Sequence, residues 1–249
     1  MKRILLVCAA ALLSSACATP YAPIPYDRES ASVQKIVVVE DAMPDSATTL
    51  KLATNGANVS SAAASAGLAG LLIMPIAIGI EAGIESGQRG SMLAALESQG
   101  FDGEAIFDEA LEAALKESGY EIGSLDVARQ SSRKLIELTA DAEAESGSAI
   151  LDIAGAGYGY QLVGGGTQWR PFVNVSVRLT DPADPTRILL DNRVAYNPVA
   201  TPDVILNIPP EEEFGFAKMD DLEADPEKAA EGLKRALVAT ANGVATLLK

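Results

Sequence analysis

The stretch FVNVSVRL, residues 172–179, decides the fold, because apolar and polar residues alternate along it almost without a break. Side chains on a strand point alternately to its two faces, so the alternation predicts a strand with one face against a core. A similar run from Ser148 to Val163 precedes it across Gly164–Gly166, and another from Arg187 to Tyr196 follows across Asp181–Pro185. Short connections join antiparallel neighbours. We therefore predict a three-stranded antiparallel meander.

Helical periodicity appears on both sides of this meander. Glu104–Ser118 places Phe107, Leu111, Ala114 and Leu115 on one stripe, and Gly119 follows where a left-handed cap is usual. Near the C-terminus, Asp225-Pro226 supplies an N-cap and a first-turn proline for a helix that runs to Leu248. Ser91–Gln99 is expected to extend a helix from the apolar segment 52–87 as far as Gly100, and the more polar run Ala128–Ala144 predicts another helix.

Two short β-branched runs complete the predicted elements. QKIVVVE, residues 34–40, is typical of a strand covered on both faces, and Tyr120–Ile122 predicts a shorter one. The first strand and the meander can share one sheet. We therefore predict an α+β fold in which an antiparallel sheet, formed by the N-terminal strand and the C-terminal meander, carries its helices on one face.

The N-terminus has the pattern of an export signal. Lys2-Arg3 is followed by an apolar run, Ile4–Leu13, and then by the small residues Ser14–Ala16 before Cys17. The apolar run is too short for a bilayer core, which needs about 20 residues. Small residues immediately before a cysteine resemble a lipobox, although Ser14 stands where leucine is common. The resemblance implies that residues 1–16 are removed and that Cys17 is acylated; an ordinary cleavable signal is the alternative.

The signal predicts where the protein is located and how the rest of the chain is divided. Ala18 follows the cysteine, where aspartate marks inner-membrane retention in well-studied bacteria, so we expect a lipid anchor in the outer membrane, facing the periplasm. Three prolines in residues 17–32 predict a flexible tether. Residues 33–249 then form one α+β domain.

Composition excludes several kinds of chemistry. The chain has no histidine, which excludes a Cys–His or Ser–His–Asp catalytic site. Its two cysteines, Cys8 and Cys17, lie at or before the cleavage point. The mature domain is therefore expected to have neither a disulfide nor a thiolate metal site. The net charge of −15 disfavours binding to nucleic acid or to anionic lipid head groups. We expect no cofactor, no metal and no enzymatic activity, and a membrane attachment through acyl chains on Cys17.

Residues 52–87 form the second unusual feature. No charged residue occurs between Leu52 and Ile80, and small residues recur every four positions on both sides of Pro75. The recurring positions are Ala62, Ala66 and Gly70, then Gly79, Gly83 and Gly87. On a helix this spacing makes a groove that another helix can approach closely. Three interpretations stay open: a buried core helix, an interface between protomers or with another envelope protein, and a membrane-inserted segment.

Four residues of the predicted meander are candidates for a functional site. Alternation places Tyr158 and Tyr160 on one face, near Trp169 across the glycine turn. They predict either an aromatic surface for stacking a glycan or peptide, or side chains that pack beneath a helix. Asp152 lies between Leu151 and Ile153, so its carboxylate points the other way. We expect it at the surface, and a functional buried acid is the alternative.

Residues 101–196 resemble the periplasmic lipoprotein domains grouped with the curli-secretion lipoprotein CsgG. The matching positions are Phe107, Leu111, Ala114, Leu115, Gly119 and Tyr120, followed by Ala149, Leu151, Ile153 and Gly155, then Leu179, Asp181 and Leu189. The resemblance implies a scaffold, a pore subunit or an assembly factor, and no catalytic residues. We therefore expect a structural or assembly role, with two alternatives: a subunit of an oligomeric secretion or transport complex, and a carboxylate-dependent enzyme acting on glycans.

Overall fold

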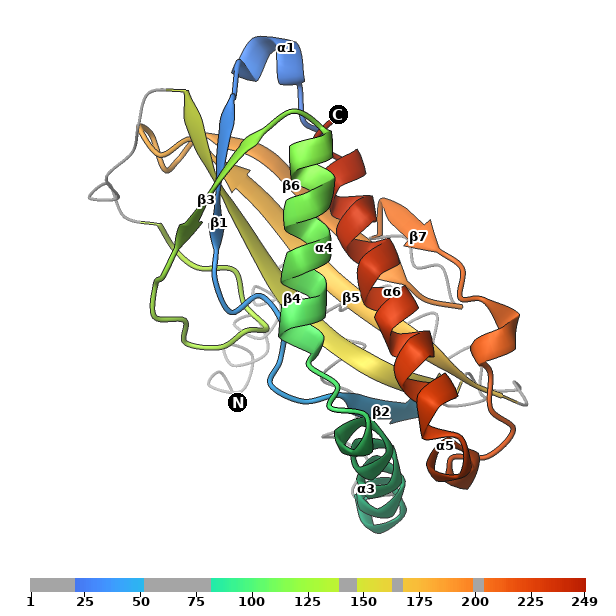
Figure 1. Ribbon diagram of the computed structural model, residues 1–249. Helices are drawn as coiled ribbons and strands as arrows, with labels where there is room; N and C mark the ends of the chain where they lie inside the picture. Colours follow the sequence, from blue (N-terminus) through green and yellow to red (C-terminus); the bar gives the residue numbers. More distant parts are fainter. Residues whose placement is uncertain (1–20, 52–81, 139–146, 163–167, 199–203) are drawn as a thin grey trace, which may run out of the picture.

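The computed structural model describes residues 21–51, 82–138, 147–162, 168–198 and 204–249 (Figure 1). In chain order its elements are α1 (Arg28–Ala31), β1 (Lys35–Val39), β2 (Thr48–Lys51), α3 (Ala82–Ser98), α4 (Gly103–Glu117), β3 (Glu121–Leu125), β4 (Ser148–Leu162), β5 (Trp169–Thr180), β6 (Ile188–Tyr196), β7 (Leu206–Ile208), the 3-10 turn η2 (Glu212–Phe214), α5 (Asp220–Ala224) and α6 (Pro226–Thr246).

The meander is confirmed and forms the centre of a seven-stranded sheet. β5 pairs antiparallel with β4 on one side and with β6 on the other, so that Leu179 lies opposite both Leu151 and Leu190. A bulge between Gly155 and Gly157 shifts the register of the long strand β4. The strand order across the sheet is β3-β1-β4-β5-β6-β7, with β2 also pairing with β4.

The sheet is mixed rather than antiparallel throughout, which corrects part of our expectation. β1 runs parallel to both of its neighbours, β3 and β4, and the short strands β2 and β7 run parallel to β4 and β6. β1 and β3 are joined through helix α4, and a helical crossover is the connection that parallel neighbours require. The sequence predicted both strands and the helix between them, but not their direction.

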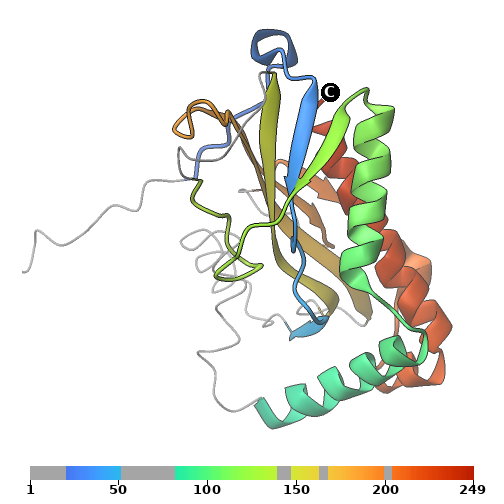
Figure 2. The ribbon, with the colours of Figure 1, turned by 60° about the vertical axis from the view of Figure 1, so that its left-hand side comes forward.

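The α+β class is confirmed, with α4 and α6 on one face of the sheet. Figure 2 shows the two helices side by side, to the right of the strands. Their apolar stripes and the helix-facing strand residues are buried together. The largest fully buried side chains of this core include Phe107, Leu111, Leu115, Leu151, Ile153, Leu179 and Leu190. The helix ends also follow the sequence, since Asp102 caps α4 through Ala105 N, Asp225 caps α6 through Lys228 N, and Gly119 has a φ of +88°.

The helix predicted over Ala128–Ala144 is wrong for residues 128–138, which form an irregular segment; residues 139–146 lie outside the described part. The segment is instead held to the sheet. Arg129 Nε donates to the carbonyl of Glu40 at 2.7 Å, and the backbone N–H of Ile136 donates to the Asp152 carboxylate at 2.6 Å. A carboxylate that accepts from a backbone N–H competes with the helical hydrogen bond.

The tether predicted over residues 17–32 is also corrected, because the chain is attached to the fold from Tyr21 onward. Ile24 forms an antiparallel bridge with Asp191 of β6, and the short helix α1 follows. Arg28 then donates to the carbonyl of Ser118 at 3.0 Å, and its guanidinium lies 4.6 Å from the centre of the Tyr120 ring. The prolines of this segment favour an extended chain, but not a free one.

Most of the small-residue segment lies outside the described residues, including Ala62, Ala66, Gly70 and Gly79. Gly83 and Gly87 belong to the backbone of α3, which confirms a helix that ends before Gly100, where φ is +59°. Within the described ranges, no helix has the length and apolar character that a membrane crossing requires. The three interpretations of residues 52–87 therefore stay open.

Candidate functional site

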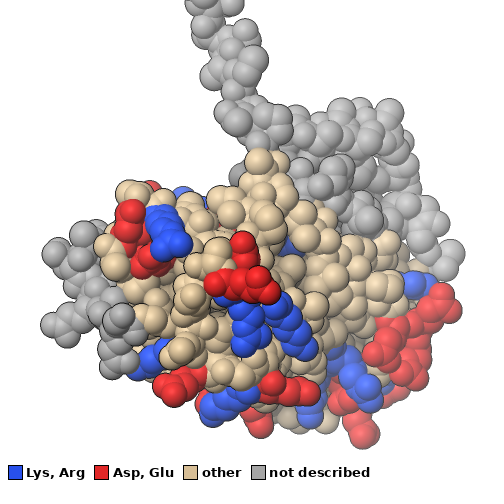
Figure 3. All heavy atoms as spheres, turned by 90° about the horizontal axis from the view of Figure 1, so that it is seen from above, with Lys and Arg blue, Asp and Glu red and all other residues tan. Residues whose placement is uncertain are grey.

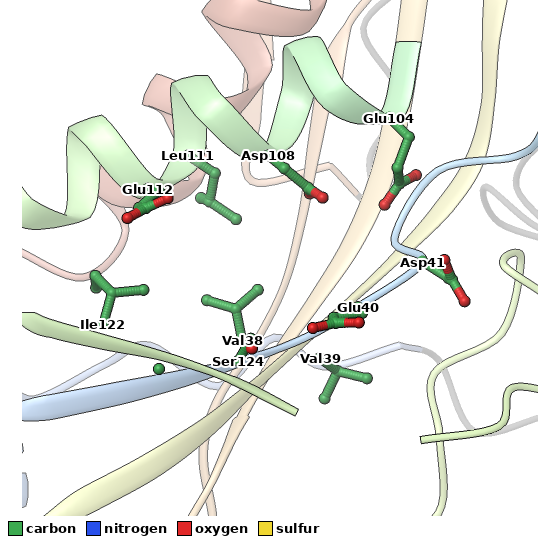
Figure 4. Close-up of a pocket in the computed structure, with 11 residues that line it drawn as sticks. Val38, Val39, Glu40, Asp41, Glu104, Asp108, Leu111, Glu112, Ile122 and Ser124 are labelled. Atoms are coloured by element: carbon green, nitrogen blue, oxygen red, sulfur yellow. The ribbon is translucent and has the colours of Figure 1, made fainter. Parts of the chain in front are cut away.

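A cleft of about 420 Å³ opens between α4 and the strands β1 and β3 (Figure 4). Its apolar floor comes from residues of all three elements: Val38, Val39, Leu111 and Ile122. Its ionisable lining consists of five carboxylates: Glu40, Asp41, Glu104, Asp108 and Glu112. In the part of the chain that the structure describes, no lysine or arginine lines it. The cleft is therefore a half-apolar groove with a strongly negative wall.

Two local patterns gather these carboxylates. Glu104, Asp108 and Glu112 are spaced four residues apart, so they lie on one face of α4, the face that Figure 4 shows above the strands. Glu40 and Asp41 follow directly after β1, and Asp41 has a φ of +57°, which turns the chain away from the strand. The four-residue spacing on α4 is visible in the sequence, but without the fold it does not indicate that these carboxylates line a cleft.

Glu104 has a structural role within the cleft. Its carboxylate accepts the backbone N–H of Ala42 at 2.8 Å and that of Met43 at 2.6 Å, and so fixes the loop after β1 against the start of α4. Burial raises the pKa of this carboxyl, and the two backbone donors oppose that rise. Glu112 at the other end of the row forms an ion pair with Lys116. Asp108, between them, is left to face the open groove.

Asp108 is the most perturbed acid of the cleft. Burial, followed by repulsion from Glu104, Glu40 and Asp41, raises the pKa of Asp108 to about 7. A carboxyl in this range can hold or release a proton near neutral pH. The cleft can therefore attract a cationic group, or move a proton at Asp108.

We expect Asp108→Asn to stabilise the fold at pH 8 and to leave its stability at pH 4 close to that of the wild type. The folded-state pKa of about 7 lies above the unfolded value near 4, so the wild type loses stability as pH rises through this window. The full shift in the pKa of Asp108 corresponds to a loss of about 4 kcal/mol in the free energy of unfolding. Solvent screening in an open cleft reduces this loss to roughly 1–2 kcal/mol. Urea unfolding at pH 4, 6 and 8 measures the difference.

Glu117→Gln is the matched control for this test, because Glu117 is an exposed carboxylate on the same helix, outside the cleft. It should reproduce the wild-type dependence on pH. If the unfolding free energy of Asp108→Asn depends on pH between 4 and 7 as that of the wild type does, the environment of Asp108 does not raise its pKa.

The acidic cleft continues into a second hollow of about 600 Å³ below the start of α4, and the two share Asp41 and Glu104. This hollow adds Asp45 and Asp102, and Tyr158 forms part of its wall. Among the residues that the structure describes, no three acidic side chains are grouped so as to hold a metal ion. The negative charge is spread along the groove rather than concentrated at one point.

Charge on the face seen from above is more evenly mixed. On the face shown in Figure 3, lysine and arginine side chains are interspersed with aspartate and glutamate. The cleft between α4 and β1 differs, because all of its ionisable lining is acidic.

The three aromatic residues considered as a stacking surface are buried instead: Tyr158 is 4% exposed, Tyr160 0% and Trp169 4%. Tyr160 donates to the carbonyl of Ala229 in α6 at 3.0 Å, and Tyr158 lies against Gly103 of α4. The two tyrosines do share a face, as alternation predicted, and helices cover it. Of the two interpretations that the sequence left open, the structure shows packing beneath a helix.

Asp152 points away from Leu151 and Ile153 as expected, but it is buried rather than exposed. It forms an ion pair with Arg129 at 2.7 Å, and both side chains are nearly inaccessible, 3% and 4% exposed. Burial raises the pKa of this carboxyl, and the charge of Arg129 and the N–H of Ile136 oppose that rise. The irregular segment 128–138, part of the helix predicted over Ala128–Ala144, supplies both partners.

Comparison with protein-family models, with curated proteins and with solved structures finds no match to this chain.

Proposed function

We propose that this chain is an envelope lipoprotein, anchored by acyl chains on Cys17 to the periplasmic side of the outer membrane, with a non-catalytic structural, scaffold or assembly role. The observation that carries the proposal is the sequence Ser14–Cys17 after a short apolar run. The absence of histidine and of a further cysteine beyond Cys17 supports the non-catalytic part. The resemblance of residues 101–196 to envelope assembly lipoproteins points in the same direction.

Cys17→Ser should abolish incorporation of an alkyne fatty acid in labelled cells, while the wild type is tagged. Cys8→Ser is the matched control, because Cys8 lies inside the apolar run that is removed and should leave the tag unchanged. Equal tagging of the wild type and Cys17→Ser would contradict the proposal. Fractionation of the membranes on a sucrose gradient then separates an outer-membrane address from an inner-membrane one.

One observation favours the alternative of a carboxylate-dependent enzyme acting on glycans. Asp108, with a pKa of about 7, faces Glu40 across a groove, and glycosidases use a pair of carboxyl groups that differ in protonation. Hydrolysis of peptidoglycan fragments by the purified protein, lost in both Asp108→Asn and Glu40→Gln, would support this alternative. Absence of hydrolysis by the wild type would favour the scaffold role.

A further inference from the structure

The chain contacts the folded domain from Tyr21 onward, only four residues after Cys17. The hydroxyl of Tyr21 donates to the carbonyl and to the carboxylate of Asp191, at 3.0 Å each, and the Arg193 guanidinium lies 3.9 Å from the centre of its ring. Ile24 continues this attachment through two backbone hydrogen bonds with Asp191, of 2.9 and 3.0 Å. The first described residues therefore belong to the outer edge of β6.

This attachment limits how far the domain can stand from an anchor at Cys17. Four residues span at most about 14 Å when fully extended, whereas the sixteen residues of a free tether over 17–32 would span more than 50 Å. A tether of that length would let any face of the domain approach a membrane. The short connection leaves only the neighbourhood of Tyr21, which is the β6 edge.

The same edge carries two isoleucines that water reaches. Among the described residues, the exposed large hydrophobic side chains are Ile24, 38% exposed, and Ile205, 49% exposed. Ile205 donates its N–H to the carbonyl of Arg193 at 3.1 Å, two residues along β6 from the partner of Ile24. Their attachment points are thus roughly 7 Å apart on one strand edge. A single exposed isoleucine is ordinary, but here two lie beside the anchored end.

The charge distribution agrees with this orientation. The acidic cleft is built from β1 and β3 at one edge of the sheet, whereas β6 and β7 lie toward the other. β4 and β5 separate them, so an anchor at β6 holds the five clustered carboxylates away from lipid phosphates. At the attachment itself the aromatic ring of Tyr21 is paired with a cationic side chain, a combination suited to a membrane interface.

We infer that the β6 edge, defined by Tyr21, Ile24, Ile205 and Arg193, lies against the surface of the lipid bilayer. The inference rests on the proposed acylation of Cys17. In this orientation Ile24 and Ile205 contact the head-group region, and the acidic cleft faces the periplasm, where it is open to other molecules.

The test uses the full, acylated protein in vesicles of phosphatidylethanolamine and phosphatidylglycerol. Beyond the acylated Cys17 the mature chain has no cysteine, so Ile24→Cys, Ile205→Cys and Ser124→Cys each provide one thiol for a fluorescent label. Ser124 is the matched control, exposed on β3 at the far edge of the sheet. Lipids with a spin label near the head group should quench the labels at residues 24 and 205 at least twofold more strongly than the label at 124.

Equal quenching at the three positions, or stronger quenching at residue 124, would overturn the inferred orientation. Flotation with the vesicles reports separately on the anchor. If the protein floats and Cys17→Ser does not, the proposed acylation holds whatever the quenching shows. If neither floats, the lipoprotein proposal itself fails. Thermal unfolding of the labelled variants verifies that each is folded.

Discussion

Asp152→Ala is expected to destabilise the fold by about 3–5 kcal/mol, because it leaves the guanidinium of Arg129 buried without its carboxylate. The same change removes the acceptor of the Ile136 N–H and so detaches the segment 126–138 from the sheet at two points. Denaturant unfolding followed by circular dichroism measures the loss. Amide hydrogen exchange at Ile136 should rise in parallel.

Two variants separate the buried charge from a general effect of removing an acid. Glu231→Ala removes the carboxylate of an exposed ion pair with Arg235 and should change stability little. Asp152→Leu combined with Arg129→Met replaces the buried pair by apolar side chains and should recover much of the loss. If Asp152→Ala is no more destabilising than Glu231→Ala, the burial of this pair does not matter to stability.

The strands and helices that were predictable are those with a strong local signal. The alternation in residues 172–179 and the apolar stripe of Phe107, Leu111 and Leu115 both correspond to elements that bury one face in the core. The helix expected over 128–138 lacked such a stripe. Its conformation is decided by Asp152 and Arg129, whose pairing depends on a sheet that the local sequence does not describe.

The candidate site could be predicted only in part. Four-residue spacing places Glu104, Asp108 and Glu112 on one helix face. The acidic cleft forms only because Glu40 and Asp41, more than 60 residues earlier than Glu104, lie opposite that face. Parallel pairing of β1 with β3 brings the two groups together. The direction of a strand is set by tertiary connections, and hydrophobic periodicity carries no information about it.

The glycines of β4 have a role that their spacing alone did not reveal. Gly155 approaches the loop after β1 so closely that its N–H donates to the carbonyl of Ala42 at 2.7 Å, and a Cβ there would lie 2.7 Å from the same oxygen. Gly159 lies opposite Thr48 of β2, and a Cβ at Gly159 would meet the Thr48 carbonyl oxygen. In the structure these glycines let two other segments, the loop after β1 and the strand β2, pack closely on β4.

Gly159→Ala is therefore expected to be severely destabilising, by about 3 kcal/mol or more. A Cβ at this position would overlap the backbone carbonyl of Thr48, and the φ of +147° is one that L-residues rarely adopt. Since backbone cannot move aside as a side chain does, β2 must separate from β4. Thermal unfolding measures the loss, and faster amide exchange at Thr49 and Leu50 would locate it in β2.

Gly90→Ala is the matched control, since it adds the same methyl group at an exposed position of α3 with no atom within 4 Å. Alanine is the better helix former, so this variant should gain about 0.5–1 kcal/mol. A loss of stability in Gly159→Ala with a gain in Gly90→Ala would show that the effect at Gly159 comes from the close approach of β2. A Gly159→Ala protein as stable as the wild type would mean that β2 does not pack on β4 in solution.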